Sequence, residues 1–392
     1  MNREHSQAGA PNKLQDQTTI THAFRDAVAF LLLAAKERHA SDIHLVPRDR
    51  EGGGDVRFRI FGHLVTFKTY ASPSHWDDLV KEVKRRASLS FERGVAQDAR
   101  FSDALTRCDY RVSLIPVRVG ERQAEQIVLR ILPQDATYSL DALTIPFAAK
   151  EALRRALALD QGLIILTGPT GSGKTSTLMS ALMAVDRARY SVLTLEDPVE
   201  YVLEGVTQVQ VTAKLTFAEG LRAFLRQDPD YILVGETRDR ETAHAVIQAA
   251  NTGHVVLTTL HTNSAAAAFA RLGALGVDDA LARETAVFVS AQRLVPRLCA
   301  ACAEPDPGCL PLIERMFGAR EAEIRPCQSK GCAACNGTGV SGRSLLFEFM
   351  APAQSDLGAR ELRQVSSLRE QALFLFEKGD LHASELMALA PV

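Results

Sequence analysis

The segment from Gly168 to Thr175 has the sequence GPTGSGKT and matches the pattern G-x-x-x-x-G-K-[ST] in full. It follows the apolar run 163–166 and precedes a run with helical spacing, the strand–loop–helix context that a phosphate-binding loop requires. Glycines let backbone N–H groups turn toward phosphate oxygens, and the helix N-terminus adds its positive end. Lys174 can reach the β- and γ-phosphates, and the Thr175 hydroxyl can bind Mg²⁺. The sequence therefore predicts a site for a nucleoside triphosphate.

Acidic residues follow two further apolar runs. Glu196 and Asp197 follow one of them, and Glu236 follows the next. Ligands of open α/β sheets bind at the carboxyl ends of strands, so we expect these carboxylates near the phosphate loop. Hydrolysis needs a group that orients water, and Glu196 and Glu236 compete for that role. Gly235 stands where an Asp usually precedes the Glu of a second nucleotide-site motif.

Two histidines bracket the apolar run 255–260. His254 and His261 are seven positions apart, and in a regular strand such a separation places them on opposite sides. Only one of them is expected to reach the nucleotide. We favour His261, because it lies at the carboxyl end of the predicted strand.

Six of the seven cysteines lie between positions 299 and 335. Four of them form two C-x-x-C pairs, Cys299 with Cys302 and Cys332 with Cys335. Four thiolates in this arrangement suit a tetrahedral Zn²⁺ ion with no open position, which predicts a structural metal site; a redox pair is the alternative. Cys309 and Cys327 are further thiols nearby. Either could be a spectator, and Cys327 could substitute as a ligand.

The elements that position these groups have the pattern of an α/β domain. Short apolar runs at 163–166, 192–195, 231–234 and 255–260 predict buried strands, and helical patterns separate several of them. This alternation is typical of a sheet with crossover helices.

Ahead of this domain, the pattern predicts a small mixed α/β domain. Helical spacing begins at Thr21, and a second helix begins at Ser72-Pro73. Strand-like runs occupy 56–60, 110–117 and 126–132, and the alternation in the first of them places Arg57 and Arg59 on one face. The predicted organisation is a flexible tail (1–20), a small domain (21–132), a linker (133–139), a P-loop core (140–296), a cysteine element (297–344) and a C-terminal helical region (345–392).

Composition excludes several classes of protein. Apolar residues make up 46% and charged residues 23%, as in an ordinary globular chain. The formal net charge of −2 gives no global attraction to nucleic acid or anionic lipid. The longest apolar run, Ala27 to Ala35, is far shorter than the ~20 residues that span a bilayer, and the first 20 residues contain no apolar signal core. We therefore expect a cytoplasmic protein.

From about Ser41 to its C-terminus the chain resembles the ATPases of type II secretion and type IV pilus assembly. Beyond the phosphate loop, the similarity rests on Glu196–Glu200, Leu225–Asp230, Gly235–Asp239, Thr252–Ala265, Gln292–Leu294 and the two cysteine pairs. The resemblance implies a RecA-like P-loop ATPase domain preceded by a PAS-like small domain, with a zinc-knuckle insertion and C-terminal helices.

The same resemblance implies ATP, Mg²⁺ and Zn²⁺ as ligands, with ATP bound between the small and large domains. It assigns hydrolysis to Glu236 and Glu196 beside Lys174, and sensing of the γ-phosphate region to His261. The residues that it implies for nucleotide contact are Gly168, Pro169, Thr170, Gly171, Ser172, Gly173, Lys174, Thr175, Ser176, Arg111, Arg130, Arg222, Arg226 and Arg238.

The resemblance also implies a homohexamer that is recruited to the inner face of the cytoplasmic membrane by platform and docking proteins. In the family, the cysteine element separates secretion and pilus-extension enzymes from retraction enzymes, which favours a role in assembly or secretion. A DNA-uptake motor is an alternative, although no basic cluster with interleaved aromatics supports nucleic-acid binding. A nucleotide-binding scaffold with weak turnover is another.

Three positions of the small domain depart from the family pattern. Val46, Phe61 and Ala99 stand where Glu, Asp and Gly are usual. The nucleotide motifs themselves are intact, so the departures bear on coupling to domain movement rather than on the chemistry. We also expect that the additional N-terminal domain by which many relatives dock is absent.

Overall fold

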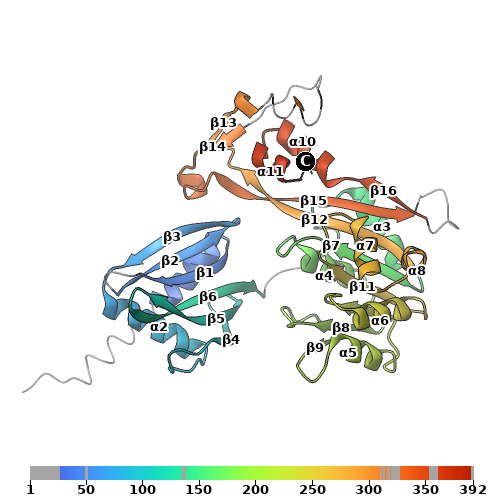
Figure 1. The fold of residues 1–392 in the computed structure, drawn as a ribbon, viewed down its shortest axis with the longest axis horizontal. Helices are drawn as coiled ribbons and strands as arrows, with labels where there is room; N and C mark the ends of the chain where they lie inside the picture. The colour runs from blue at the N-terminus through green and yellow to red at the C-terminus, as the bar shows by residue number, and fades with distance from the viewer. Residues whose placement is uncertain are drawn as a thin grey trace, which may run out of the picture. The chain divides into compact units, whose positions relative to one another are not determined.

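The computed structural model describes residues 27–48, 52–134, 138–309, 311, 314–315, 318, 327–352 and 361–389. The chain divides into two compact units, residues 1–136 and 137–392, each with its own apolar core (Figure 1). The boundary falls within the predicted linker. The predicted tail at 1–20 and the predicted helix start at Thr21 lie outside the described residues.

The small unit is built on a six-stranded antiparallel sheet with the strand order β3-β2-β1-β6-β5-β4. Residues 27–37 are helical, and α2 (Pro73–Arg86) begins after Ser72 as predicted. Apolar residues of both helices pack in one cluster with buried residues of the sheet, such as Phe58. The strands are β1 (Ala40–Pro47), β2 (Gly54–Ile60), β3 (His63–Tyr70), β4 (Gln97–Asp103), β5 (Cys108–Val119) and β6 (Arg122–Pro133).

Phe61 and Gly62 form the two-residue turn between β2 and β3. Their φ angles are 48° and 97°, so both lie in the left-handed region that a type I′ hairpin turn requires. A bulky side chain is rarely found in this region, whereas Asp tolerates it. The Phe61 ring stacks on His39 at 6.3 Å between centroids.

The large unit is built on an eight-stranded sheet with the order β16-β15-β12-β7-β11-β10-β8-β9. The strands from β12 to β9 pair in parallel, and β15 and β16 join antiparallel at the other edge. The strands are β7 (Gly162–Thr167), β8 (Val192–Glu196), β9 (Thr207–Gln210), β10 (Tyr231–Val234), β11 (Val255–Leu260), β12 (Ala286–Leu298), β15 (Val340–Pro352) and β16 (Leu362–Ser366).

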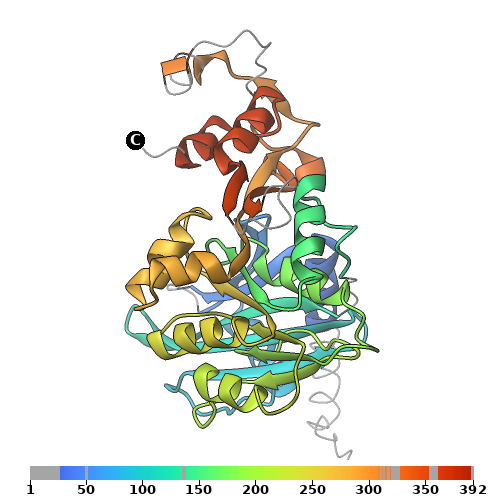
Figure 2. The same ribbon diagram turned by 90° about the vertical axis from the view of Figure 1, so that its right-hand side faces the viewer.

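Helices cover both faces of this sheet, which is why its parallel strands are continuously apolar (Figures 1 and 2). On one face lie α3 (Phe147–Leu157) and α4 (Lys174–Met183). On the other lie α5 (Phe217–Phe224), α6 (Arg240–Ala250), α7 (Ala267–Ala274), α8 (Asp279–Thr285), α10 (Leu368–Glu377) and α11 (Ala383–Leu389). No helix in the described ranges is both long and apolar enough to cross a membrane.

The four predicted strands of the core are present as β7, β8, β10 and β11. The predicted C-terminal helical region, 345–392, ends in α10 and α11, but the end of β15 and the whole of β16 precede these helices. β15 pairs with β12 over ten positions, and the middle of each strand is buried. Burial on both faces removes the alternation by which a strand is recognised, so tertiary pairing rather than local pattern decides this element.

Candidate nucleotide-binding site and metal centre

The predicted phosphate loop connects β7 to α4. Gly168, Gly171 and Gly173 have φ angles of 144°, 76° and 90°, all in the region that favours glycine. A Cβ atom at Gly168 would also lie 2.3 Å from the carbonyl oxygen of Gln292 on β12. The close approach of β12 therefore requires glycine at the first position of the loop.

Lys174 is folded back onto its own loop. Its Nζ donates hydrogen bonds to the carbonyl oxygens of Gly168 at 2.7 Å and Pro169 at 3.0 Å, and the residue is 8% exposed. Burial lowers the pKa of Lys174, and the negative charge of Glu236 acts in the opposite direction. At the start of α4, Thr175 and Ser176 are exposed beside it.

The parallel register brings the chemistry-bearing residues to one edge of the sheet. β7, β11, β10 and β8 are consecutive neighbours, and all of them run in the same direction. The residues at or just after their carboxyl ends are Gly168, His261, Gly235 and Glu196. Segments separated by many residues in the chain thus meet around the phosphate loop.

Glu236 lies between two basic side chains. Its Oε1 is 2.5 Å from Nη2 of Arg238, and its Oε2 is 3.7 Å from Nε2 of His261. The backbone around it is anchored, because the hydroxyl of Thr259 donates to the carbonyl of Gly235 at 2.7 Å. The side chain of Glu236 is 12% exposed, so this carboxylate is largely withdrawn from solvent.

The surroundings of His261 lower its pKa from the ordinary value. Burial lowers its pKa most, the positive charges of Lys174 and Arg238 lower it further, and only Glu236 raises it. His254, at the other end of β11, has its Nδ1 2.9 Å from the carbonyl oxygen of Ala249. Of the two histidines, the structure places only His261 beside Glu236.

Glu196 has a different environment. It is 5% exposed, and its Oε1 accepts hydrogen bonds from the hydroxyl of Thr194 at 2.6 Å and from Nε2 of Gln208 at 2.9 Å. Gln208 lies on β9, a strand that the sequence analysis did not predict. The sequence contains no signal for this contact, because it depends on the pairing of β8 with β9.

The glycine at position 235 has a steric reason. A Cβ atom there would lie 3.1 Å from the carbonyl oxygen of Leu195, which accepts a hydrogen bond from the Gly235 N–H at 2.8 Å. A side chain there would require the Leu195 carbonyl, at the end of β8, to shift slightly. The Asp that usually occupies this position would meet the same obstacle.

Arginines predicted to contact nucleotide lie in both units. In the large unit, Arg222 and Arg226 are exposed near the end of α5, and Nη1 of Arg226 donates to the carbonyl of Arg222 at 2.8 Å. Arg238 contacts Glu236 instead. In the small unit, Arg111 and Arg130 are directly opposite one another on β5 and β6.

The register of the small sheet extends this pair into a row across five strands. Going from β2 to β4, the residues in the row are Arg59, Asp42, Arg130, Arg111 and Arg100. Asp42 is the one acidic member, with Oδ1 3.2 Å from Nε of Arg130 and Oδ2 3.9 Å from Nε of Arg59. Arg59 and Arg100 were not among the predicted site residues, since only the register shows that they share this row.

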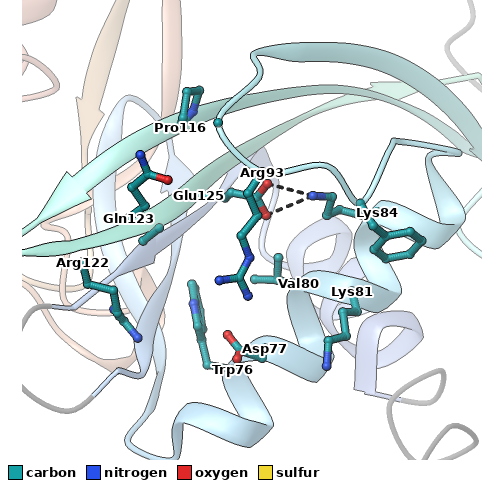
Figure 3. A pocket seen from close by; sticks show the side chains of 13 residues that line it. Trp76, Asp77, Val80, Lys81, Lys84, Arg93, Pro116, Arg122, Gln123 and Glu125 are labelled. Atoms are coloured by element: carbon teal, nitrogen blue, oxygen red, sulfur yellow. Dashed lines mark hydrogen bonds and ion pairs between the residues drawn. The ribbon is translucent and has the colours of Figure 1, made fainter.

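A cavity of about 220 Å³ lies elsewhere in the small unit, between α2 and the β5–β6 hairpin (Figure 3). Inside it, Nζ of Lys84 lies 2.8 Å from Oε1 of Glu125, and these side chains are only 3% and 11% exposed. The guanidinium groups of Arg93 and Arg122 lie on either side of Trp76 in the same view. None of the predicted site residues is among those that line this cavity.

The four predicted metal ligands lie together. The sulfur atoms of Cys299, Cys302, Cys332 and Cys335 all lie within 4.8 Å of one another. Separations of 3.8–4.0 Å between several of these sulfurs are close to the ~3.8 Å edge of a tetrahedron with Zn–S bonds of ~2.3 Å. The donor set and its geometry are therefore consistent with a tetrahedral zinc site.

Backbone N–H groups favour the ionised thiol of Cys335, whereas burial raises the pKa of Cys302 in the same cluster. Burial raises the pKa of Cys335, but the N–H groups of Cys332 and Gly339 donate to its sulfur at 3.1 and 3.2 Å, and the net pKa lies below the usual value. Cys309 is not a member of the cluster, since its Sγ donates to the carbonyl of Asp306. The side chain of Cys327 lies outside the described part of the chain.

Residues 17–380 match the family described as "Type II/IV secretion system protein". Among curated proteins, the type II secretion system protein E of Klebsiella pneumoniae is 41% identical over 335 residues, 82% of this chain and 64% of that protein. The type II secretion system ATPase E of Vibrio cholerae is 38% identical over 329 residues, 82% of this chain and 63% of that protein. The chain thus spans slightly less than two thirds of the length of these relatives.

Solved structures share the fold. The ATPase DotB of Legionella pneumophila superposes with a TM-score of 0.67 at 23% identity, covering 93% of this chain and 95% of that chain. The pilus retraction motor PilT, solved with bound ADP, superposes with a TM-score of 0.60 at 24% identity, covering 92% and 96%. At this level of identity the likeness concerns the arrangement of the elements alone.

Proposed function

Because the chain belongs to the type II/IV secretion system protein family, we propose that it hydrolyses ATP and thereby powers a secretion or pilus-assembly machine. One observation carries the proposal: a complete phosphate loop shares a sheet edge with a carboxylate–histidine pair, Glu236 and His261. A relative from Vibrio cholerae with 38% identity has the name of an ATPase, which supports the same reaction.

Binding of the triphosphate is assigned to the loop. Its backbone N–H groups and the N-terminus of α4 favour phosphate oxygens, and the exposed hydroxyl of Thr175 is available to Mg²⁺. The Nζ of Lys174, which bonds to the carbonyls of Gly168 and Pro169, exchanges these acceptors for phosphate oxygens. This exchange provides the ammonium group with hydrogen-bond acceptors in both states.

We assign orientation of the attacking water to Glu236. This carboxylate faces two basic groups that can move away from it, Arg238 and His261. Glu196 instead accepts hydrogen bonds from two neutral side chains of the fold, Thr194 and Gln208. Glu196 supports the site from the next strand. The lowered pKa of His261 favours its neutral form, which can donate a hydrogen bond to a phosphate oxygen without adding a full charge.

Arginines supply the remaining positive charge in this proposal. A guanidinium stabilises the charge that spreads over the transferred phosphoryl group, and Arg238 can do so once it leaves Glu236. Arg222 and Arg226 on α5 are further candidates. From the small unit we propose Arg111 and Arg130, because the row in which they lie contains four arginines and one aspartate.

The cysteine cluster is assigned to Zn²⁺ with a structural role. Four thiolates close the coordination sphere, so the ion would hold the turns around Cys299 and Cys332 and take no part in hydrolysis. For assembly we propose a homohexamer that works with membrane-bound platform and docking proteins at the inner face of the cytoplasmic membrane. Support for these partners comes from the named relatives alone.

The decisive experiment is a measurement of Mg²⁺-dependent phosphate release by the full chain, with Lys174→Ala and Glu236→Gln as paired variants. We expect turnover by the native chain and its loss in both variants. Turnover that is undiminished in both variants would refute hydrolysis at this site. Stimulation by single-stranded DNA would instead favour the DNA-uptake alternative.

A further inference from the structure

The segment Gln292–Leu294 matches the family, but the proposed function gives it no role. It lies on β12, which pairs with β7 up to the partners Ala291 and Thr167. Gln292 therefore follows the last paired position and lies beside Gly168, the first residue of the phosphate loop. Parallel pairing fixes this segment at the base of the candidate site.

Gln292 is hydrogen-bonded to α4, the helix that follows the phosphate loop. It is fully buried, and its Nε2 donates to the hydroxyl of Thr177 on α4 at 2.9 Å. The same hydroxyl donates to the carbonyl of Gly173 at 3.3 Å, within the phosphate loop. Leu294 lies close to the same loop, since a Cβ atom added at Gly173 would be 3.7 Å from its Cδ1.

Arg293 contacts the histidine loop, residues 261–266 between β11 and α7. Its Nη2 donates to Oδ1 of Asn263 at 3.1 Å, two residues after His261. β15 supports the same loop, because Oε1 of Glu348 accepts the backbone N–H of Ala265 at 2.6 Å. The histidine loop is thus attached to two neighbouring strands, β12 and β15.

Consecutive residues of a strand point to opposite faces of its sheet. Thr177 belongs to α4 on one face, and Asn263 precedes α7 on the other. Gln292 and Arg293 therefore reach the two halves of the site from a single peptide unit of β12. Any displacement of this peptide unit moves both attachments together.

Both side chains have unused hydrogen-bonding capacity. Oε1 of Gln292 and Nε of Arg293 are buried without a hydrogen-bond partner, and so is Oγ of Ser172 in the phosphate loop. The unpaired atoms of Gln292 and Arg293 are available for hydrogen bonds in addition to those with Thr177 and Asn263.

We propose that Gln292 and Arg293 are positioning residues that keep the phosphate-loop helix and the histidine loop in register from opposite faces of β12. They act through Thr177 and Asn263 rather than on the reacting atoms. The inference rests on the proposed ATP hydrolysis. In this proposal Gln292 supports nucleotide binding, and Arg293 supports turnover.

The test compares Gln292→Met with Arg293→Met in the full chain. The measured quantities are the affinity for a fluorescent ATP analogue with Mg²⁺, and kcat and KM for ATP. Gln292→Met should weaken nucleotide affinity and raise KM about three- to ten-fold, with a smaller change in kcat, since one neutral hydrogen bond is lost. Arg293→Met should lower kcat about ten-fold or more and leave the affinity unchanged, because this bond involves a charged donor.

Removal of the partner groups repeats the test without altering β12. Thr177→Val should reproduce the effect of Gln292→Met, and Asn263→Ala that of Arg293→Met. The double variant Arg293→Met/Asn263→Ala should be no worse than either single variant, which is the signature of one shared interaction. Arg297→Met is the matched control, because this exposed arginine lies on the same strand and face, four residues further along.

Two results would overturn the inference. One is native affinity and native kcat in both methionine variants; the other is an equal loss of affinity and kcat in both, accompanied by a lower melting temperature. If the native chain bound MgATP without hydrolysing it, the proposed function would fail. The affinity of Gln292→Met, and the NMR shift of the His261 ring in Arg293→Met against Arg297→Met, would then decide the inference alone.

Discussion

Nη2 of Arg238 lies 2.5 Å from Oε1 of Glu236, and the arginine side chain is 67% exposed while the carboxylate is 12% exposed. An exposed cation thus neutralises a nearly buried anion beside the phosphate loop. The energy of such a pair is modest when one partner is solvated, so the arginine can leave at little cost. This makes the pair a suitable resting arrangement for a carboxylate that must be released when nucleotide arrives.

Substitutions of Lys174 and of Glu236 should impair different steps, nucleotide binding and hydrolysis respectively. Lys174→Ala should lose MgATP binding, since the ammonium group contacts the phosphates, whereas Glu236→Gln should bind MgATP and lose turnover by about 100-fold or more. Equilibrium binding and phosphate release measured on the same samples separate the two effects. Lys214→Ala, at an exposed lysine outside the site, should behave as the native chain. Native turnover in Glu236→Gln would remove this residue from the mechanism.

The pKa of His261 should lie below 6.5 and respond to its neighbours in opposite directions. Lys174→Met should raise it, because the lysine charge opposes protonation, and Glu236→Gln should lower it. Histidine NMR titrations, assigned with His261→Gln, measure both shifts. Shifts of the same sign in the two variants would contradict this electrostatic account.

The lowered pKa of His261 should make the free energy of unfolding depend on pH. The folded state binds a proton at His261 less readily than the unfolded state, so the contribution of this residue is complete above about pH 6.5. It should decline as the pH falls from there through the folded-state pKa. His261→Gln should flatten this part of the stability profile, measured by denaturant unfolding between pH 5 and about 8.

The cysteine cluster should hold one zinc ion per chain. Cys332→Ser should abolish stoichiometric zinc and lower the melting temperature by about 5 °C or more, since a tetrahedral site loses a ligand. Metal analysis and thermal unfolding, with and without a chelator, provide the measurement. Cys309→Ser is the matched control, because Cys309 lies outside the cluster and should leave the metal content unchanged. Full zinc occupancy in Cys332→Ser would refute the assignment.

The stability effects of substituting Lys84 and Glu125, which form a buried ion pair, should be coupled. Lys84→Met should cost about 3–5 kcal/mol, because it leaves the Glu125 carboxylate buried and uncompensated, while Lys84→Met/Glu125→Leu should recover most of this loss. Trp76 is the one tryptophan of the chain and lines the same cavity, so its fluorescence reports unfolding of the small unit. Lys81→Met, at a lysine side chain that is 61% exposed, is the control. A cost below about 1 kcal/mol for Lys84→Met would contradict burial of the pair.

Local patterns in the sequence were sufficient for the phosphate loop and the strands that lead to it. β7, β8, β10 and β11 were predicted because short apolar runs ended at polar residues, and that pattern needs no tertiary information. The same pattern did not reveal β12 or β15. Their burial on both faces, and their pairing across an insertion of more than 40 residues, leave no local periodicity to detect.

The sequence by itself determined which groups are available: a loop that can bind phosphates, carboxylates and a histidine at strand ends, and two cysteine pairs with metal-ligand spacing. Each of these depends on residue type and short spacing, which the chain encodes directly. Only the tertiary structure decided which groups meet. It paired Glu236 with Arg238, placed Arg111 and Arg130 in a row with Arg59 and Arg100, and put Gln292 behind the phosphate loop. These relationships follow from sheet register and strand order, which long-range packing sets and no short segment specifies.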